Sequence, residues 1–166
     1  MLNENKNIIS AQVVDLQSNV RRFCYLVEQI QQYNNQAWLT EISQLLPRIH
    51  AVIGMLDGCS RNECLFSLSD LDERFDLFCR LKKIIGEVDG YEVGEELAEN
   101  QLYGSLSDDL TDLYFELKRG IDLIKDDPTN VPAALSMWRD GFFMHWGKHL
   151  LDAEKHLYEL RVHHRI

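Results

Sequence analysis

The chain of 166 residues contains no long hydrophobic run. No window approaches the roughly 18 consecutive apolar residues of a membrane-spanning helix. The first residues, Met-Leu-Asn-Glu-Asn-Lys-Asn, lack the apolar core of a secretory signal peptide. We therefore expect a cytoplasmic protein with no membrane partner.

Basic residues are scarce relative to acidic ones. There are 17 Lys and Arg against 27 Asp and Glu, which gives a formal net charge of −10. Nucleic-acid binding depends on cationic side chains that neutralise phosphates, and anionic membrane surfaces attract the same side chains. The charge balance of this acidic protein therefore argues against nucleic-acid and membrane-surface partners.

The sequence also lacks several motifs of known chemistry. Its four cysteines (Cys24, Cys59, Cys64 and Cys79) include no Cys-x-x-Cys pair, so the usual spacing of zinc and redox sites is missing. Without an export signal, we expect these thiols to be reduced. No glycine-rich phosphate loop, Walker-type lysine or Ser-His-Asp order is present.

Apolar residues recur at intervals of three and four along most of the chain, the signature of amphipathic helices, and no segment shows the alternation of a strand. This pattern predicts an all-α fold: a single domain over residues 1–166, built as a bundle of about five mostly antiparallel helices. The predicted helices cover residues 8–33, 36–57, 70–86, 107–126 and 131–163. Pro47 lies inside the second helix and predicts a kink or a restart there.

The segment 87–104 separates the third and fourth predicted helices. It carries six acidic residues and three glycines, so we expect an acidic, solvated connector with a short helical turn at 95–101. Ser69, followed by Asp72, predicts a capping box at the start of the third helix. Ser107 is predicted to cap the fourth helix.

Polar residues gather on the last two predicted helices. At 100° per residue, Asp109, Asp112 and Glu116 form a file along one flank of the apolar stripe of helix 107–126. On helix 131–163, His149 falls near the centre of the apolar face. His145 lies beside that centre, on one flank of the apolar face. The carboxylates and imidazoles therefore border the core.

The short connection between these two helices predicts antiparallel neighbours. Equal distances from the turn then place Asp109 level with His149, and Asp112 level with His145 or Trp146. Three interpretations follow: a core histidine satisfied by a carboxylate, a pocket without metal, or a divalent-metal site. The metal site would use Asp109, Asp112, His145 and His149, because imidazoles together with carboxylates suit such ions.

Two glycines interrupt the last predicted helix. A glycine in a helix interior costs roughly 1 kcal/mol relative to alanine. Gly141 and Gly147 therefore indicate close approach by a neighbouring helix or a ligand. The aromatic residues Trp138, Phe142 and Trp146, spaced by four, are interpreted as core.

Several segments together resemble an uncharacterised bacterial all-helical family, domain of unknown function 5063. The segments are Phe-Cys-x-Leu-Val-Glu at 23–28, Leu-Leu-Pro-x-Ile at 45–49, Ser-Leu-Ser-Asp-Asp-Leu-Thr-Asp-Leu-Tyr-x-x-Leu-Lys at 105–118 and Trp-Gly-x-x-Leu-x-x-Ala at 146–153. The resemblance implies a small cytoplasmic bacterial helical domain with no assigned activity. The matching positions are Asp108, Asp112, Lys118, Trp146 and Gly147, whereas Glu116 and Glu154 depart from the family pattern.

The function expected from these observations is a non-catalytic binding or protein-interaction module, with a protein partner or a second copy of the chain as partner and no cofactor. The alternative is a metal-dependent hydrolase, in which Asp109, Asp112, Glu116, His145 and His149 serve as ligands or general bases. The residues of the candidate polar site are Asp108, Asp109, Asp112, Glu116, Lys118, Trp138, His145, Trp146 and His149.

Overall fold

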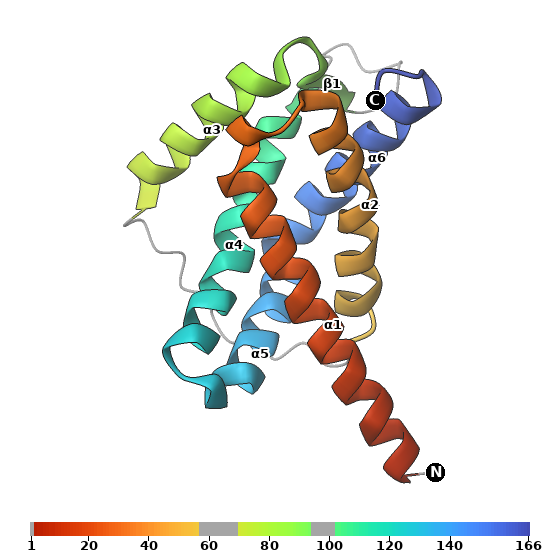
Figure 1. Ribbon diagram of the computed structural model, residues 1–166, viewed down its shortest axis with the longest axis vertical. Helices are drawn as coiled ribbons and strands as arrows, with labels where there is room; N and C mark the ends of the chain where they lie inside the picture. Colours follow the sequence, from red (N-terminus) through yellow and green to blue (C-terminus); the bar gives the residue numbers. More distant parts are fainter. Residues whose placement is uncertain (1, 57–69, 94–101) are drawn as a thin grey trace.

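The structure, a computed structural model, describes residues 2–56, 70–93 and 102–166 (Figure 1). These residues are almost entirely helical, so the all-α prediction is confirmed. A π-helical turn, Phe142–Trp146, joins the last two helices, so that residues 131–162 form one continuous helical rod. The helices are α1 (Leu2–Glu28), α2 (Asn35–Ile53), α3 (Leu71–Ile85), α4 (Leu106–Asp126), α5 (Val131–Gly141) and α6 (Gly147–Val162).

Helix α4 is the centre of the fold. It packs against α1, α3, α5 and α6, while α2 packs against α1 and α6 (Figure 1). The leucines of its apolar stripe, Leu106, Leu110, Leu113 and Leu117, are completely buried. Because α4 has neighbours on several sides, some of its polar residues are buried too: Asp109, Thr111 and Glu116. The central position of α4 therefore places its carboxylates between helices.

Two short strands precede α4, where the sequence predicted no strand. Strand β1 (Gly90–Val93) pairs antiparallel with β2 (Leu102–Ser105). Each strand is only four residues long, too short to show an alternating pattern in the sequence. The helical turn predicted at 95–101 lies outside the described residues. The strand pair brings Tyr91 of β1 to the start of α4.

The N-terminus of α4 is capped by Ser105, not by Ser107 as predicted. The Ser105 hydroxyl accepts a hydrogen bond from the Asp108 N–H and donates one to the Asp89 carboxylate, at 3.4 and 2.8 Å. Asp89 accepts two more from the first turn: its carboxylate from the Ser107 N–H, at 2.7 Å, and its carbonyl from the Leu106 N–H, at 2.9 Å. Three N–H groups that a helix start leaves unpaired are satisfied in this way.

Other helix boundaries differ from the sequence expectation. Helix α1 ends at Glu28 and is followed by the 3₁₀ turn Ile30–Gln32. Helix α2 continues through Pro47 without a restart and ends at Ile53. At the end of α3, Gly86 adopts a positive φ of 67°, a conformation that glycine adopts readily and that often ends a helix. The capping box predicted at Ser69 lies outside the described residues.

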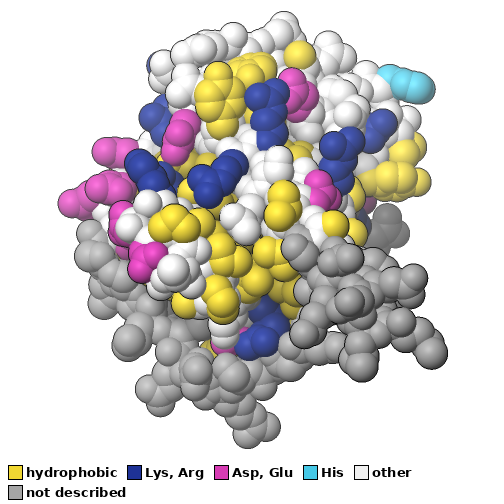
Figure 2. Space-filling model, turned by 60° about the horizontal axis from the view of Figure 1, so that its bottom comes forward, with side chains coloured by type: hydrophobic (Ala, Val, Ile, Leu, Met, Phe, Trp, Pro, Cys, Tyr) yellow, Lys and Arg dark blue, Asp and Glu magenta, His cyan; other side chains and the backbone are white. Residues whose placement is uncertain are grey.

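The surface carries charges of both signs. Figure 2 shows one face of the molecule, on which Lys and Arg side chains are interspersed with acidic and exposed hydrophobic ones. None of the described helices combines the length and the apolar composition that crossing a bilayer requires.

Candidate metal centre

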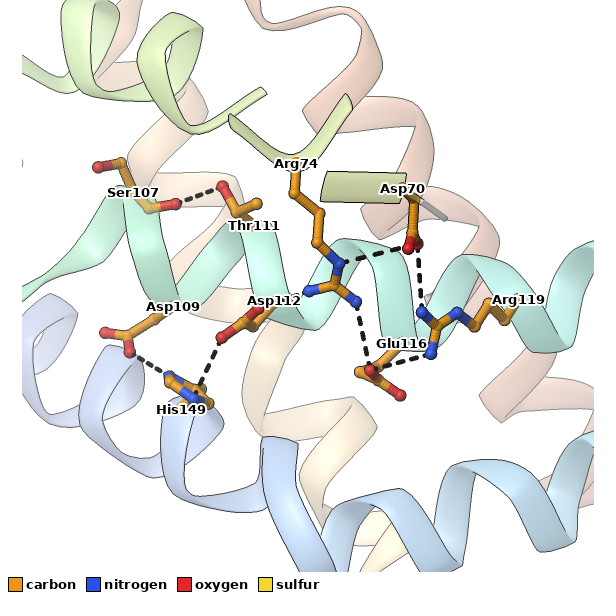
Figure 3. Close-up of polar contacts among 9 residues, drawn as sticks. All are labelled: Asp70, Arg74, Ser107, Asp109, Thr111, Asp112, Glu116, Arg119 and His149. Atoms are coloured by element: carbon orange, nitrogen blue, oxygen red, sulfur yellow. Dashed lines mark hydrogen bonds and ion pairs between the residues drawn. The ribbon is translucent and has the colours of Figure 1, made fainter. Parts of the chain in front are cut away.

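The carboxylates of α4 face two helices at once. Figure 3 shows His149 of α6 on one side of Asp109 and Asp112, and Arg74 of α3 on the other side of Asp112. Asp109 is almost fully buried, at 4% exposure, whereas the side chains of Asp112 and His149 are each 22% exposed. The site therefore lies at the edge of the core, with partial access to solvent.

His149 lies between two carboxylates. Its Nδ1 is 2.8 Å from Asp109 Oδ1, and its Nε2 is 3.2 Å from Asp112 Oδ2. The hydrogen bond with Asp109 raises the pKa of His149; burial opposes this shift, and the negative charge of Asp112 adds to it. In the free protein these contacts favour an imidazolium that donates from both ring nitrogens.

Tyr91 fixes the far side of Asp109. Its phenol donates a hydrogen bond to Asp109 Oδ2, and its ring stacks on His156 of α6 with centroids 4.8 Å apart. Burial raises the pKa of Tyr91, and the hydrogen bond to Asp109 raises it further. His156 in turn donates from Nε2 to the Val88 carbonyl, at 2.6 Å. Asp109 is therefore held from two directions, which fixes the orientation of the His149 ring.

His145 completes a group of three potential ligands. One ligand atom each from Asp112, His145 and His149 lie within 4.8 Å of one another. The centroids of the His145 and His149 imidazole rings are 5.2 Å apart, and the ring planes are inclined at 62°. His145 belongs to the π-helical turn, a feature that adds a residue to a helix and often occurs at functional sites.

Glycines on both sides of the π-helical turn allow its packing. A Cβ at Gly147 would lie 2.3 Å from the Phe142 carbonyl oxygen, which accepts the Gly147 N–H. A Cβ at Gly141 would lie 2.8 Å from the indole nitrogen of Trp146. The close approach inferred from these glycines is therefore made by neighbouring parts of the same helical rod.

A network of ion pairs adjoins the metal-ligand group. Arg74 contacts Asp112 at 2.6 Å and Glu116 at 3.4 Å. Arg119 contacts Glu116 at 3.3 Å and Asp70 at 3.2 Å. Glu116 is therefore held by two guanidinium groups and lies away from His149, as Figure 3 shows. The network joins α3 to α4.

The family of the chain follows from sequence comparison. The family described as domain of unknown function (DUF5063) matches residues 7–163. The chain belongs to this family. A crystal structure of protein BF1032 from Bacteroides fragilis is similar, with 20% sequence identity and a TM-score of 0.72, covering 90% of this chain and 91% of that one. At this identity the likeness concerns the fold. No curated protein matches the chain.

Besides Asp109 and Glu116, four more predicted site residues of this DUF5063 member lie outside the metal-ligand group. Lys118 pairs with Asp122 and Glu28, at 3.3 and 3.6 Å. Trp138 is buried, and its indole donates to a backbone carbonyl of α4 at 3.0 Å. Trp146 is buried against Gly141, and Asp108 is exposed at the first turn of α4. Partial desolvation of the Asp108 carboxyl by neighbouring groups raises its pKa, and the negative charge of Asp112 adds to this shift.

Sequence reasoning missed four residues that contact the candidate site of this chain: Asp70, Arg74, Arg119 and Tyr91. The spacing of Asp70 and Arg74 by four residues is a signal of a helix ion pair, and the structure places these groups 3.7 Å apart. No spacing in the sequence indicates which helix Arg74 faces. Tyr91 lies in the strand pair that was not predicted.

Proposed function

We propose that this protein is a cytoplasmic, non-catalytic binding module whose ligand is one divalent transition-metal ion, held by Asp112, His145 and His149. The observation that carries the proposal is the convergence of one carboxylate oxygen and two imidazole nitrogens within 4.8 Å. Ligand atoms about 2.1 Å from a tetrahedral zinc ion lie about 3.4 Å apart. Closing the group around an ion therefore requires side-chain shifts of an ångström or so.

The contact between His149 and Asp109 supports the same proposal. Histidine ligands of metals commonly donate the second ring N–H to a carboxylate, which fixes the tautomer and the ring orientation. Here Nδ1 faces Asp109 and Nε2 faces Asp112. A metal ion would occupy the place of the proton between Nε2 and the Asp112 carboxylate. Asp109 then serves as an orienting residue and not as a ligand.

The ligand types favour zinc. Imidazole nitrogens with one carboxylate suit Zn²⁺ and its neighbours in the transition series, whereas Mg²⁺ and Ca²⁺ prefer oxygen ligands alone. Three protein ligands leave at least one position for water or for an anion.

The contacts of the other carboxylates favour binding over hydrolysis. A general base needs a carboxylate that is available to a water molecule. Asp109 is engaged by His149 and Tyr91, and Glu116 is engaged by Arg74 and Arg119. Two of the residues considered as hydrolytic bases are therefore already committed to protein contacts.

The test is zinc binding by protein purified without a histidine tag and stripped of metal. Elemental mass spectrometry after equilibration with Zn²⁺ should find one equivalent, and Co²⁺ should give the visible absorption of a bound ion. With zinc at about 100 times its dissociation constant, linkage adds about 2.7 kcal/mol to stability. For a chain of this size, such a gain raises Tm by about 5–10 °C.

Three variants decide whether the site is the one proposed. Asp112→Asn and His145→Ala should abolish the bound equivalent and the Tm increase while the helical circular dichroism is retained. His163→Ala is the matched control, because this exposed histidine near the C-terminus is outside the group, and it should bind as the parent does. Folded parent protein that binds no zinc would refute the proposal, and zinc-dependent phosphoester hydrolysis lost in Asp112→Asn would replace it with the hydrolase alternative.

A further inference from the structure

A second candidate site lies between α2 and α6, which pack side by side in Figure 1. A cleft of about 460 Å³ opens there, a size typical of small-molecule sites. It combines apolar walls with two groups of opposite charge. The lining residues are Ser43, Pro47, Glu154, Tyr158, Arg161 and Val162.

One end of the cleft offers hydrogen-bond acceptors. Glu154 Oε2 lies 2.9 Å from His50 Nδ1, whereas Glu154 Oε1 is buried and has no hydrogen-bond partner among the described residues. Pro47 has no N–H to donate to the Ser43 carbonyl, one turn earlier in α2. A buried acceptor without a donor is unfavourable. This end of the cleft therefore favours a ligand that brings N–H donors and positive charge.

The other end of the cleft offers a cation. Arg161 lies seven residues after Glu154 on α6, so the two Cα atoms are about 10 Å apart along the helix. Its side chain is exposed, and no described acidic side chain forms an ion pair with it. An arginine guanidinium binds carboxylates through paired hydrogen bonds. Tyr158 lies between the two charges and is 68% exposed.

We propose that this cleft binds a small zwitterion of the size of a free dipeptide, with its ammonium group at Glu154 and its carboxylate at Arg161. Two residues of extended chain span about 7 Å, a little less than the distance of about 10 Å between the two Cα atoms, and the flexible Glu and Arg side chains can make up the difference. Pro47, Val162 and the Tyr158 ring provide contact for an apolar ligand side chain.

The proposal is independent of the metal centre. The cleft lies on the α2 side of α6, whereas His149 faces α4. None of the residues lining the cleft belongs to the group of potential metal ligands. Loss of dipeptide binding and loss of zinc binding can therefore be measured separately on the same protein.

The experiment titrates the full chain with glycyl-leucine by NMR or calorimetry, alongside two capped forms. N-acetyl-glycyl-leucine lacks the ammonium group, and glycyl-leucine amide lacks the carboxylate. We expect saturable binding of glycyl-leucine, and each cap should weaken it by about tenfold or more, because it removes a charge-assisted hydrogen bond. Equal binding of either capped form would overturn the proposal, as would no binding of glycyl-leucine at about 10 mM.

Variants locate the binding. Glu154→Gln and Arg161→Gln should each weaken glycyl-leucine binding by about tenfold or more. Glu154→Gln should also bind glycyl-leucine and N-acetyl-glycyl-leucine equally well. Arg161→Gln should bind glycyl-leucine and glycyl-leucine amide equally well. Lys155→Gln is the control, because this exposed residue of α6 does not line the cleft. Parent-like discrimination in both cleft variants would refute the assignment.

Discussion

Replacing Gly147 with alanine should destabilise the protein because of one contact in the π-helical turn. The new Cβ would lie 2.3 Å from the Phe142 carbonyl oxygen and 3.0 Å from the Phe142 ring. The first contact is with backbone that is itself hydrogen-bonded to the Gly147 N–H. It therefore cannot be relieved by moving a side chain, and the turn must open.

The magnitude follows from two opposing effects. Inserting a methyl group into a packed site costs about 1–3 kcal/mol, and a backbone contact this short belongs at the upper end of that range. Alanine recovers about 1 kcal/mol through its greater helix preference. We therefore expect a net loss of about 2 kcal/mol, which corresponds to a fall in Tm of about 4–8 °C for a chain of this size.

Urea and thermal unfolding measure this loss. Gly90→Ala is the matched control: a Cβ there meets no atom within 4 Å, so its stability should change by no more than about 0.5 kcal/mol. The reasoning would be refuted if Gly147→Ala were as stable as the parent or more stable. Because the π-helical turn carries His145, the variant should also bind zinc more weakly if the proposed metal centre is correct.

Three further predictions concern other parts of the chain. Burial raises the pKa of the Cys24 thiol to about 12. Iodoacetamide at pH 8 should therefore modify the exposed Cys79 of the folded protein and leave Cys24 unmodified. Peptide mass spectrometry measures this difference, and equal labelling of the two cysteines would contradict the prediction. Ser105→Ala should cost about 1 kcal/mol in urea unfolding, because the cap of α4 is lost; an unchanged midpoint would show that the other capping contacts suffice. Arg74→Met should lower the free energy of unfolding by about 2 kcal/mol, because it leaves partly buried carboxylates with fewer cationic partners. An unchanged free energy of unfolding would show that the network joining α3 to α4 contributes nothing to stability.

The pairing of the last two helices was predictable because a short turn fixes it. Counting residues from that turn placed Asp109 level with His149, and their side chains are 2.8 Å apart. The π-helical turn adds a residue to the predicted helix 131–163. This extra residue shifts His149 relative to Asp109 by less than one helical turn. The match between Asp109 and His149 could therefore be derived from periodicity and loop length alone.

The contacts of α3 and of the strand pair were not predictable in the same way. Arg74 reaches Asp112 across 38 positions of sequence, and neither periodicity nor charge fixes where a helix lies after so long a connection. Tyr91 lies in a stretch with glutamates and glycines on both sides, where an acidic surface segment was the simplest interpretation. The cap of α4 was predicted at Ser107 but lies two positions earlier, at Ser105. Both serines precede acidic residues, and only the position of Asp89 distinguishes them.

The three tryptophans of the bundle are all completely buried, and two of them join different pairs of helices. Trp38 of α2 donates to the Leu26 carbonyl of α1, at 2.8 Å, and Trp138 of α5 donates to the Leu117 carbonyl of α4, at 3.0 Å. Trp146 has no hydrogen-bond partner for its indole among the described residues. The chain thus contains its own fluorescent reporters: Trp38 between α1 and α2, and Trp138 between α4 and α5. The fluorescence of variants that retain a single tryptophan would show whether the α1–α2 and α4–α5 pairs unfold in one transition or one after the other.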